Sequence, residues 1–583
     1  DKTYNSLATK NPVALLEQHD KNADSKTFIG NAEFDYKVHG FEDLRFNVNL
    51  GIDYVQSGGH EIIFPGSEVS VADGGQNGSG YRSKYEYTRI DKTLEAYAAY
   101  NKDFTGGHHF DAMLGYSWQQ FYNRSASMGW KILTGDLLSE GNPAGELFLV
   151  SFFGRLNYSY AGRYLITATL RRDGTSRFQN NKWGLFPSVA LGWNISNEEF
   201  LKDNNVLTTL KLRLSWGQTG QQGVGGYYDA LPKYQINQLG SWYQFGNVTG
   251  FVKPLTALGY NPDLKWETTS TYNVGMDFGF LEDRITAGFD VYYRNTTDMI
   301  NKIPVPSMGN LTNEMNVNIG SMVNKGFEFN VNAMVIDTKD WTWSLGANMA
   351  YNDTEITKLK ASSKDSAGVL TGDISGGTGN KIQMHQVGYA PSTFYVYEQV
   401  YDTDGRPLEG VYVDRDKDGD VDSDDRYLYK DPFADVTLGL NTTLTYRNWT
   451  LAASGHGSFG NYMYNNVASN GEMFGDLWTN TFTSNRLASA VYSDFDTACY
   501  FSDYYIKDAS FFKFDNLTLG YTFPSLYKDK KNDRNLGLNI YATVQNVCTI
   551  TAYDGLDPEI YGGIDNTIYP RPRTYILGVK FNF

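Results

Sequence analysis

The sequence predicts an all-β protein, a transmembrane antiparallel β-barrel with long extracellular loops and short periplasmic turns. Three observations predict this fold. Apolar and polar residues alternate with a period of two along many segments, the connections between these segments alternate between short and long, and aromatic residues make up 15% of the 583 residues. Tyr and Trp are abundant where interfacial girdles surround a barrel, and the 59 glycines suit many turns.

The clearest alternation lies in the last ten residues, 574–583. The residues that would share its apolar face are Tyr575, Leu577, Val579, Phe581 and Phe583, with polar or small residues between them. A strand with one apolar and one mostly polar face suits a wall between lipid and an aqueous lumen. We interpret this segment as the closing strand of the barrel, running inward so that its aromatic end lies at the periplasmic rim.

The same pattern and the turn signals predict about 17 strands. They are expected at 27–37, 43–54, 92–101, 108–118, 149–160, 163–171, 184–194, 209–217, 271–280, 285–294, 326–336, 341–351, 435–446, 449–458, 512–523, 537–546 and 573–583. In the 209–217 strand, Lys211 and Arg213 alternate with leucines, and burying these two charges in a packed core would be costly unless they were paired. A water-filled lumen on that face avoids the cost.

Connection lengths then give the orientation of the strands. Short connections are expected at 161–162, 281–284, 337–340 and 447–448, and long ones at 218–270, 295–325, 352–434 and 459–511. Barrels of this kind carry their short turns in the periplasm, have an even number of strands and begin from the periplasm. Because the count is odd and the first strand runs inward, we expect about five further strands upstream of Asp1 if the barrel has 22.

Composition excludes several other classes. A net charge of −16 argues against a nucleic-acid partner, and two cysteines, Cys499 and Cys548, provide no disulfide framework. No window approaches 18 consecutive apolar residues, so no transmembrane helix is expected. The first residues lack the pattern of a signal peptide, so an export signal is expected upstream of them.

Several local motifs carry a resemblance to a known family. They are Asn11–Leu16, Arg171–Phe178, Trp183–Ser188 followed by Gly192–Asn194, Leu210–Gly220, Asn261–Glu267, Asn318–Gly320, Asn324–Glu328, Tyr553–Glu559 and Tyr569–Tyr575. In their order and spacing they resemble the SusC/RagA family of TonB-dependent transporters in the outer membrane of Bacteroidota. The likeness runs from about residue 11 to the end of the sequence.

This resemblance implies a 22-stranded barrel with a plug domain in the outer membrane of a Gram-negative cell. It also implies TonB-energised import of a nutrient, most simply an oligosaccharide, with a peptide as the alternative, and a SusD-like lipoprotein lid on the extracellular loops. Residues 1–583 would then be the C-terminal part of the barrel. The plug and the TonB-binding segment would lie outside them.

One acidic segment, 414–425, fits the twelve-residue calcium loop. Carboxylates fall at the ligand positions 1, 3, 5, 9 and 12, Gly419 at position 6 permits the sharp turn, and a backbone carbonyl serves position 7. The candidate metal-binding residues are Asp414, Asp416, Asp418, Asp420, Asp422 and Asp425. We expect Ca²⁺ rather than Mg²⁺ here, stiffening an external loop; Asp at position 12 has a shorter arm than the usual Glu. The alternative is a solvated acidic turn.

A second group of candidates consists of loop aromatics in the 218–270 connection. Aromatic faces stack on sugars and on partner surfaces alike, and each such residue can instead pack its loop against a neighbour. The candidate substrate-binding residues are Tyr227, Tyr228, Trp242, Tyr243 and Phe245.

No catalytic constellation is evident, and we expect no enzyme. His108 and His109 lack a companion zinc pattern, and the glycine-rich stretch 74–80 lacks the Lys of a phosphate loop. The competing hypothesis is a secreted or surface carbohydrate-binding β-protein without transport activity, and an enzymatic barrel ranks third. A barrel would need detergent for extraction, whereas a secreted binding protein would dissolve in buffer.

Overall fold

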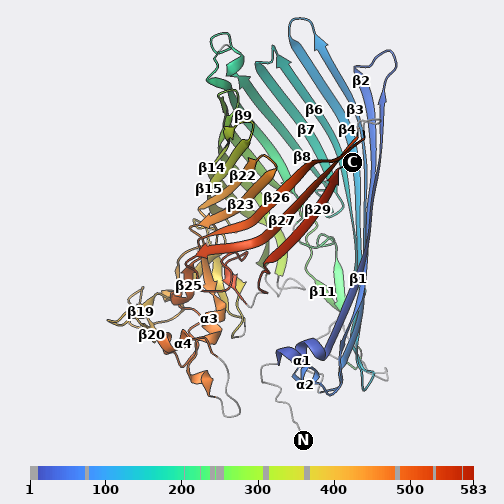
Figure 1. Cartoon of the computed structure of the whole chain (residues 1–583). Helices are drawn as coiled ribbons and strands as arrows, with labels where there is room; N and C mark the ends of the chain where they lie inside the picture. The colour runs from blue at the N-terminus through green and yellow to red at the C-terminus, as the bar shows by residue number, and fades with distance from the viewer. Residues whose placement is uncertain are drawn as a thin grey trace.

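The computed structural model shows one large, curved antiparallel sheet with long connections gathered at one end (Figure 1). It describes residues 11–72, 78–202, 204–223, 225–236, 243–244, 252, 255–305, 314–359, 368–377, 379–478, 486–529, 534–566 and 569–582. Seventeen long strands follow one another through the sheet, each paired with the next long strand in the chain. The predicted strands are all present, in the predicted order.

The long strands are β1 (His19–Lys37), β2 (Leu44–Ile63), β3 (Tyr81–Phe104), β4 (His108–Lys131), β6 (Ala144–Tyr160), β7 (Tyr164–Thr175), β8 (Trp183–Asn194), β9 (Leu207–Gln221), β12 (Glu267–Phe280), β13 (Ile285–Pro304), β14 (Glu314–Asp337), β15 (Trp341–Lys358), β22 (Val436–Tyr446), β23 (Trp449–Phe459), β26 (Phe511–Asp529), β27 (Arg534–Thr551) and β29 (Thr574–Asn582). A short strand, β5 (Leu137–Gly141), pairs with the end of β4.

The two faces of the sheet differ as the alternation predicts. In one row across β9, β12 and β13, Leu212 lies opposite Met276, which lies opposite Phe289. One residue along, Lys211 lies opposite Asp277 on the other face. Apolar side chains remain about half exposed on the first face, for example Leu191 at 47%. A continuous apolar surface of this kind belongs in contact with lipid, which identifies the apolar face as the outer one.

Connection lengths also follow the prediction in part. The four short turns lie where expected, at the rim of the sheet away from the end marked N in Figure 1, and β29 ends at the same rim. The predicted long connection at 295–325 is wrong in extent, because β13 continues to Pro304 and β14 begins at Glu314. The first four strands likewise extend well past their predicted outer ends. Beyond the membrane both faces become polar, so hydropathy no longer marks a strand whose hydrogen bonds continue.

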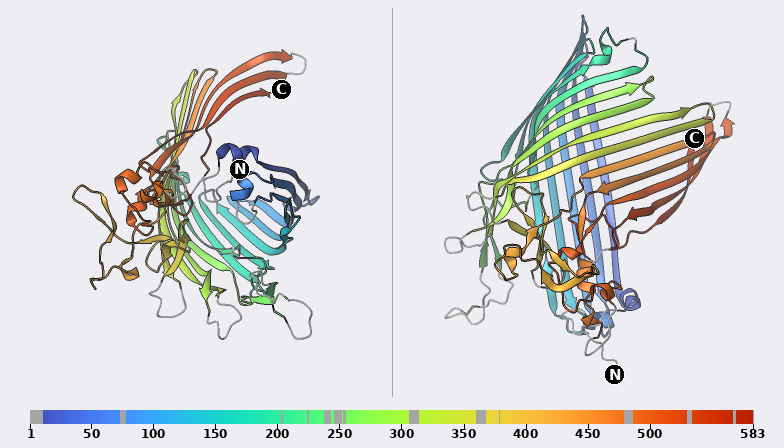
Figure 2. Two further views of the ribbon diagram at one scale, coloured as in Figure 1. Left: turned by 90° about the horizontal axis from the view of Figure 1, so that it is seen from below. Right: turned by 90° about the vertical axis from the view of Figure 1, so that its left-hand side faces the viewer.

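The sheet curves around an open interior (Figure 2). Among the described residues, β1 pairs only with β2, and β29 pairs only with β27, so no ladder joins these two strands. In the described part of the chain, no helix has both the length and the apolarity needed to cross a bilayer.

The long connections fold into a compact unit, here called the loop domain and defined as residues 368–434, 461–510 and 552–566 with the gaps given above. Its core contains Phe394, Tyr464, Phe495 and Tyr505, each at most 1% exposed. Strand β24 (Tyr462–Asn465) joins its segments, because it pairs with β25 (Ile506–Asp508) on one side and β28 (Ile564–Asp565) on the other. The domain therefore depends on contacts between segments far apart in sequence.

The remaining strands and helices belong to the connections, except α1, which precedes β1. They are α1 (Pro12–Glu17), α2 (Glu68–Ala72), β10 (Lys233–Ile236), β11 (Leu255–Leu258), β16 (Val369–Asp373), β17 (Lys381–His385), β18 (Thr393–Val396), β19 (Gln399–Tyr401), β20 (Pro407–Tyr412), β21 (Tyr427–Leu428), α3 (Asn466–Gly471) and α4 (Ala490–Ser493). Short 3-10 turns occur at Ile195–Asn197, Ser423–Asp425, Gly475–Leu477 and Asp503–Tyr505.

Candidate functional site: the lumen wall and the extracellular loops

Several charges on the inner, polar face are paired across strands. The guanidinium of Arg213 on β9 donates to both oxygens of Asp277 on β12, at 2.9 and 2.8 Å, and to both oxygens of Asp290 on β13, at 2.9 Å each. Bidentate contacts of this kind fix the position of an Arg as well as its charge. The sequence predicted that Arg213 faces water, and the structure adds two carboxylates that hold it against the wall.

Neutral amides form a second part of the polar face. Asn330 on β14 lies opposite Asn348 on β15, and Asn441 on β22 lies opposite Gly346. These side chains fill the space that glycines leave: a Cβ added at Gly346 would lie 2.6 Å from the Asn441 amide nitrogen, and one at Gly439 would lie 2.7 Å from Asn348. Glycine on one strand therefore permits a large amide on the next.

The connection from β27 to β29 is fixed to the wall by buried charge. The ammonium of Lys513, on β26 and 4% exposed, lies 2.7 Å from both Asp557 and Glu559. Arg571 contacts the same two carboxylates at 2.7 and 2.8 Å, and His456 on β23 lies 3.5 Å from Glu559. Three of these residues, Asp557, Glu559 and Arg571, fall in family-like motifs of the sequence, but nothing local in the sequence indicates Lys513 as their partner.

The structure brings three of the six predicted metal ligands together. Carboxylate oxygens of Asp414, Asp416 and Asp418 all lie within 4.8 Å of one another. Asp414 also accepts the backbone N–H of Gly419, at 3.0 Å, and Gly419 has a φ of +97° that L side chains rarely adopt. The segment therefore forms a tight turn around its first three acidic side chains. The residues on either side of the segment are extended, in β20 and β21.

The other three predicted ligands are used differently. Asp425 is 1% exposed, and its carboxylate accepts the backbone N–H groups of Arg415 at 2.6 Å and Asp422 at 2.9 Å. Asp422 caps the short 3-10 turn through the N–H of Asp424. Asp420 gives its backbone N–H to Asp418. In this geometry Asp425 holds the loop closed from inside.

The acidic side chains also affect one another electrostatically. The backbone N–H of Asp418 lowers the pKa of Asp416, but desolvation and repulsion from the carboxylates of the same turn outweigh it, so this pKa is raised. The pKa of Asp425 is lowered, chiefly by the N–H of Asp422. The pKa is therefore raised near the start of the loop, at Asp416, where carboxylates are crowded, and lowered at its end, at Asp425, where backbone amides donate.

Two of the predicted substrate-binding aromatics pack against the wall. The Tyr227 hydroxyl accepts from the amide of Asn123 on β4 at 3.2 Å, and its ring lies 4.7 Å from the Arg177 guanidinium. The Tyr228 hydroxyl accepts the backbone N–H of Glu146 at 2.9 Å. Tyr243 lies in an isolated β-bridge with Val252. Trp242 and Phe245 lie outside the described residues.

Comparison with known proteins identifies this architecture as an outer-membrane receptor barrel. Residues 3–547 match the family model described as "TonB dependent receptor-like, beta-barrel". The chain belongs to this family of TonB-dependent receptors, which are transporters of the outer membrane and not enzymes. Its membership confirms the predicted fold class and localisation.

Two curated relatives show the extent of the similarity. The chain is 42% identical to the TonB-dependent receptor SusC of Bacteroides thetaiotaomicron, over 100% of this chain and 58% of that protein. It is 30% identical to the TonB-dependent receptor P3 of Formosa agariphila, over 100% of this chain and 60% of that protein. The chain therefore spans about three fifths of the length of these relatives.

Solved structures support the fold. The RagAB peptide importer in its open-open state matches with a TM-score of 0.78 at 24% identity, over 98% of this chain and 62% of that chain. A further structure, of the RagAB peptide transporter, matches with a TM-score of 0.77 at 23% identity, over 97% of this chain and 62% of that chain.

Proposed function

We propose that the complete protein imports a nutrient through this barrel, driven by TonB, and that the nutrient is an oligosaccharide. The observation that carries the proposal is the character of the polar face. Arg213, Arg89 and Arg155 each lie against a carboxylate, Arg89 at 2.6 Å from Asp53, and amides and hydroxyls occupy much of the rest. A neutral, hydroxyl-rich cargo can exchange hydrogen bonds with such a wall, on which these arginines are already paired.

A peptide is the second candidate, because RagAB, a structural neighbour, is described as a peptide transporter. Purifying the complete protein from its native membrane and identifying bound ligand by mass spectrometry separates the two. We expect glycan, and uptake assays with a labelled neutral oligosaccharide and a labelled peptide of similar mass should agree. Bound peptide together with peptide uptake would overturn the oligosaccharide proposal.

Energy coupling is proposed to reside in the part of the relatives that residues 1–583 do not match, where the plug and the TonB-binding segment are expected. Expressing residues 1–583 alone should therefore give no energised uptake, whereas the complete protein should import. TonB-dependent import by residues 1–583 alone would contradict this assignment.

A SusD-like lipoprotein is proposed as the partner of the loop domain. Exposed apolar side chains on this domain support the proposal, among them Trp478 at 76% and Val491 at 71%. Replacing both with Ser should release a co-purifying lipoprotein. Val421→Ser, an exposed apolar residue of the acidic loop, is the matched control and should retain it. Retention by all variants would exclude Trp478 and Val491 from the interface.

We propose that the acidic loop binds Ca²⁺ through Asp414, Asp416 and Asp418, because clustered hard oxygen donors favour that ion. Without the ion, repulsion between these carboxylates should open the turn. Chelation should then expose residues 414–425 to protease while the barrel stays heat-resistant. Asp416→Ala combined with Asp418→Ala should give the same cleavage with calcium present, and Asp404→Ala, in a neighbouring acidic turn, should not. An unchanged digest and no metal by elemental analysis would leave a solvated turn.

A further inference from the structure

The outer face of β1–β4 changes character along its length. Residues directly opposite one another on neighbouring strands share a face, so each set forms a row across the four strands. The row Phe34–Val48–Ala96–Tyr116 and its neighbours are apolar, and the row Phe28–Tyr54–Ile90–Tyr122 is mostly aromatic. The next row, about 7 Å further along the strands, is Lys26–Gln56–Thr88–Arg124. The row on the membrane side of the aromatic one is Gly30–Ile52–Lys92–Gln120, so one cation, Lys92, lies before the aromatic row, and the other cations lie beyond it.

Four exposed cations lie on this face beyond the aromatic row: Lys26, Arg82, Lys84 and Arg124. Within the described part of the chain, none of them has a carboxylate within 4.0 Å. Elsewhere on the outer face a cation is paired, since Lys325 on β14 lies opposite Asp353 on β15 with 3.0 Å between their charged atoms. Four basic residues without a carboxylate partner therefore lie close together on this sector of the wall.

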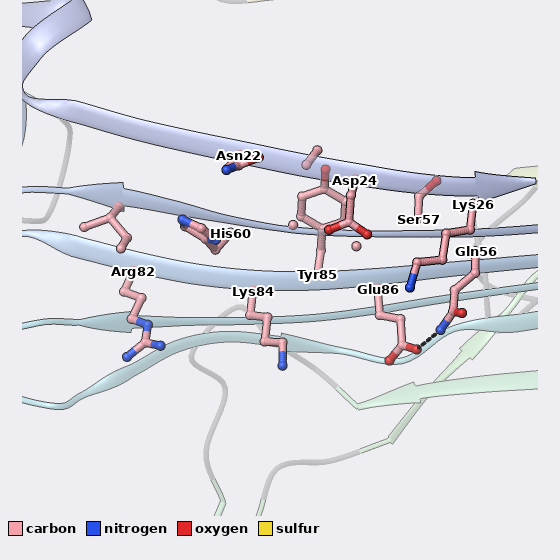
Figure 3. Close-up of a pocket in the computed structure, with 14 residues that line it drawn as sticks. Asn22, Asp24, Lys26, Gln56, Ser57, His60, Arg82, Lys84, Tyr85 and Glu86 are labelled. Atoms are coloured by element: carbon pink, nitrogen blue, oxygen red, sulfur yellow. Dashed lines mark hydrogen bonds between the residues drawn. The ribbon is translucent and has the colours of Figure 1, made fainter.

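A hollow of about 590 Å³ lies among these side chains (Figure 3). It opens at Gly58, where an added Cβ would come no nearer than 3.6 Å to another atom, the carbonyl oxygen of Tyr85. Arg82, Lys84 and Lys26 lie around it, and Figure 3 shows Arg82 and Lys84 pointing to the same side of the sheet. The absence of a side chain at Gly58 leaves room for a ligand between the row of Lys26 and the row of Lys84.

Three carboxylates of β1–β4 share this face, and Glu140 on β5 lies opposite Met128 on the same face. Two of the three on β1–β4 have polar partners. Asp20 lies 3.5 Å from the imidazole of His60, and Glu86 accepts from the amide of Gln56 at 3.2 Å. Asp24 lies in the same row as Gly58, at the rim of the hollow. On β1–β4 the four cations therefore outnumber the three acids, on a protein whose net charge is −16.

We propose that this surface binds the phosphate groups of a glycolipid headgroup in the outer leaflet of the outer membrane. Its position just beyond the aromatic row is where headgroups lie, its unpaired cations complement phosphate, and its hollow has room for a sugar ring. Each basic side chain at a membrane surface adds to the affinity for anionic lipid. The proposal depends on the outer-membrane location and not on the cargo.

The test uses the complete protein in phosphatidylcholine nanodiscs, with fluorescent diphosphorylated lipid A or the same lipid after removal of both phosphates. We expect the wild type to retain the phosphorylated lipid roughly tenfold better. Lys26→Gln, Arg82→Gln and Lys84→Gln together should abolish that preference. Lys325→Gln, which removes a paired cation from the same face, should keep it.

Heat-modifiable migration on gels checks that each variant is folded. If the triple variant does not assemble, Lys84→Gln alone should lower the preference about threefold. Equal retention of the two lipids by the wild type would overturn the proposal. So would an equal loss in Lys325→Gln and the triple variant.

Discussion

The barrel wall and the loop domain of this chain are both made of strands, but their stability has different sources. On the outer face of the wall, apolar side chains such as Leu191 remain about half exposed and need lipid to cover them. In the loop domain, Phe394 and Val396 are fully buried among residues from several distant segments. The apolar side chains of the wall are therefore covered by lipid, whereas those of the loop domain are covered by other residues of the same chain.

The same difference governs polar groups. Arg213 on the wall keeps a third of its side chain exposed beside its two carboxylates. In the loop domain, Ser502 is fully buried, and its hydroxyl donates to Oε1 of Gln399 at 2.7 Å. Water in the lumen relaxes the requirement for partners, and burial imposes it. Substitutions of polar residues should therefore change stability little on the polar face of the wall. They should be more destabilising inside the loop domain and at wall residues that contact the loops.

The largest effect is expected where the two regions meet. Lys513→Met should destabilise the β27–β29 connection by about 3–5 kcal/mol, because it leaves Asp557 buried without one of its two cations. Limited proteolysis between β27 and β29 should report the opening. Lys325→Met removes an exposed cation from a strand and is the control, expected to leave the digest unchanged. Equal digests for both variants would show that the buried network does not hold this loop.

The next effect tests the two faces of the wall. Leu212→Arg places a charge on the lipid side and should impair insertion by about 2–4 kcal/mol at mid-membrane depth. Lys211→Ala changes the lumen side one residue away and should be mild. Folding into lipid vesicles followed by denaturant titration measures both, and Leu538→Arg with Asn539→Ala repeats the comparison on β27. Equal damage from both sets would refute the assignment of the faces.

The wall could be predicted from the sequence because its rule is local. A period of two at Leu210, Leu212 and Leu214 assigns a face without any knowledge of neighbouring strands, and the register then follows from short turns. The predicted strand ends were wrong at β13 and β14, where the connection predicted at 295–325 proved to be mostly strand. There the hydrogen-bond ladder continues after the lipid contact that produces the pattern has ended.

The loop sites were predicted less completely. The acidic loop follows a spacing rule, so the cluster of Asp414, Asp416 and Asp418 was predicted, but the burial of Asp425 depends on backbone amides that no pattern shows. Lys513 meets residues about 44 positions away through folding of the whole connection. Such contacts cannot be read from periodicity, because they arise from packing between segments rather than within one.

A third prediction concerns the pH dependence of the loop domain. Burial raises the pKa of Glu472, so the folded domain holds this proton more tightly than the unfolded chain does. Stability from this group is present below the unfolded pKa and is lost as pH rises from there to the folded pKa. Glu472→Gln should flatten that slope, measured as protease resistance of the loop domain from pH 4 to 7. A slope identical to the wild type would show that Glu472 does not titrate on unfolding.

The smallest effect is expected for an ion pair on the outer face of the wall. Lys325 and Asp353 lie 3.0 Å apart, but about half of each side chain is exposed, at 57% and 44%. Solvent screens such a pair, and ordering two long side chains offsets most of the attraction. A double-mutant cycle with Lys325→Gln and Asp353→Asn, scored by denaturant unfolding in vesicles, should give a coupling near the detection limit. Raising the salt concentration should not change it. A coupling as large as the loss in Lys513→Met would mean that lipid headgroups exclude water from this pair. The exposed fraction of a side chain would then not explain why ion pairs of the wall and of the loop domain differ in strength.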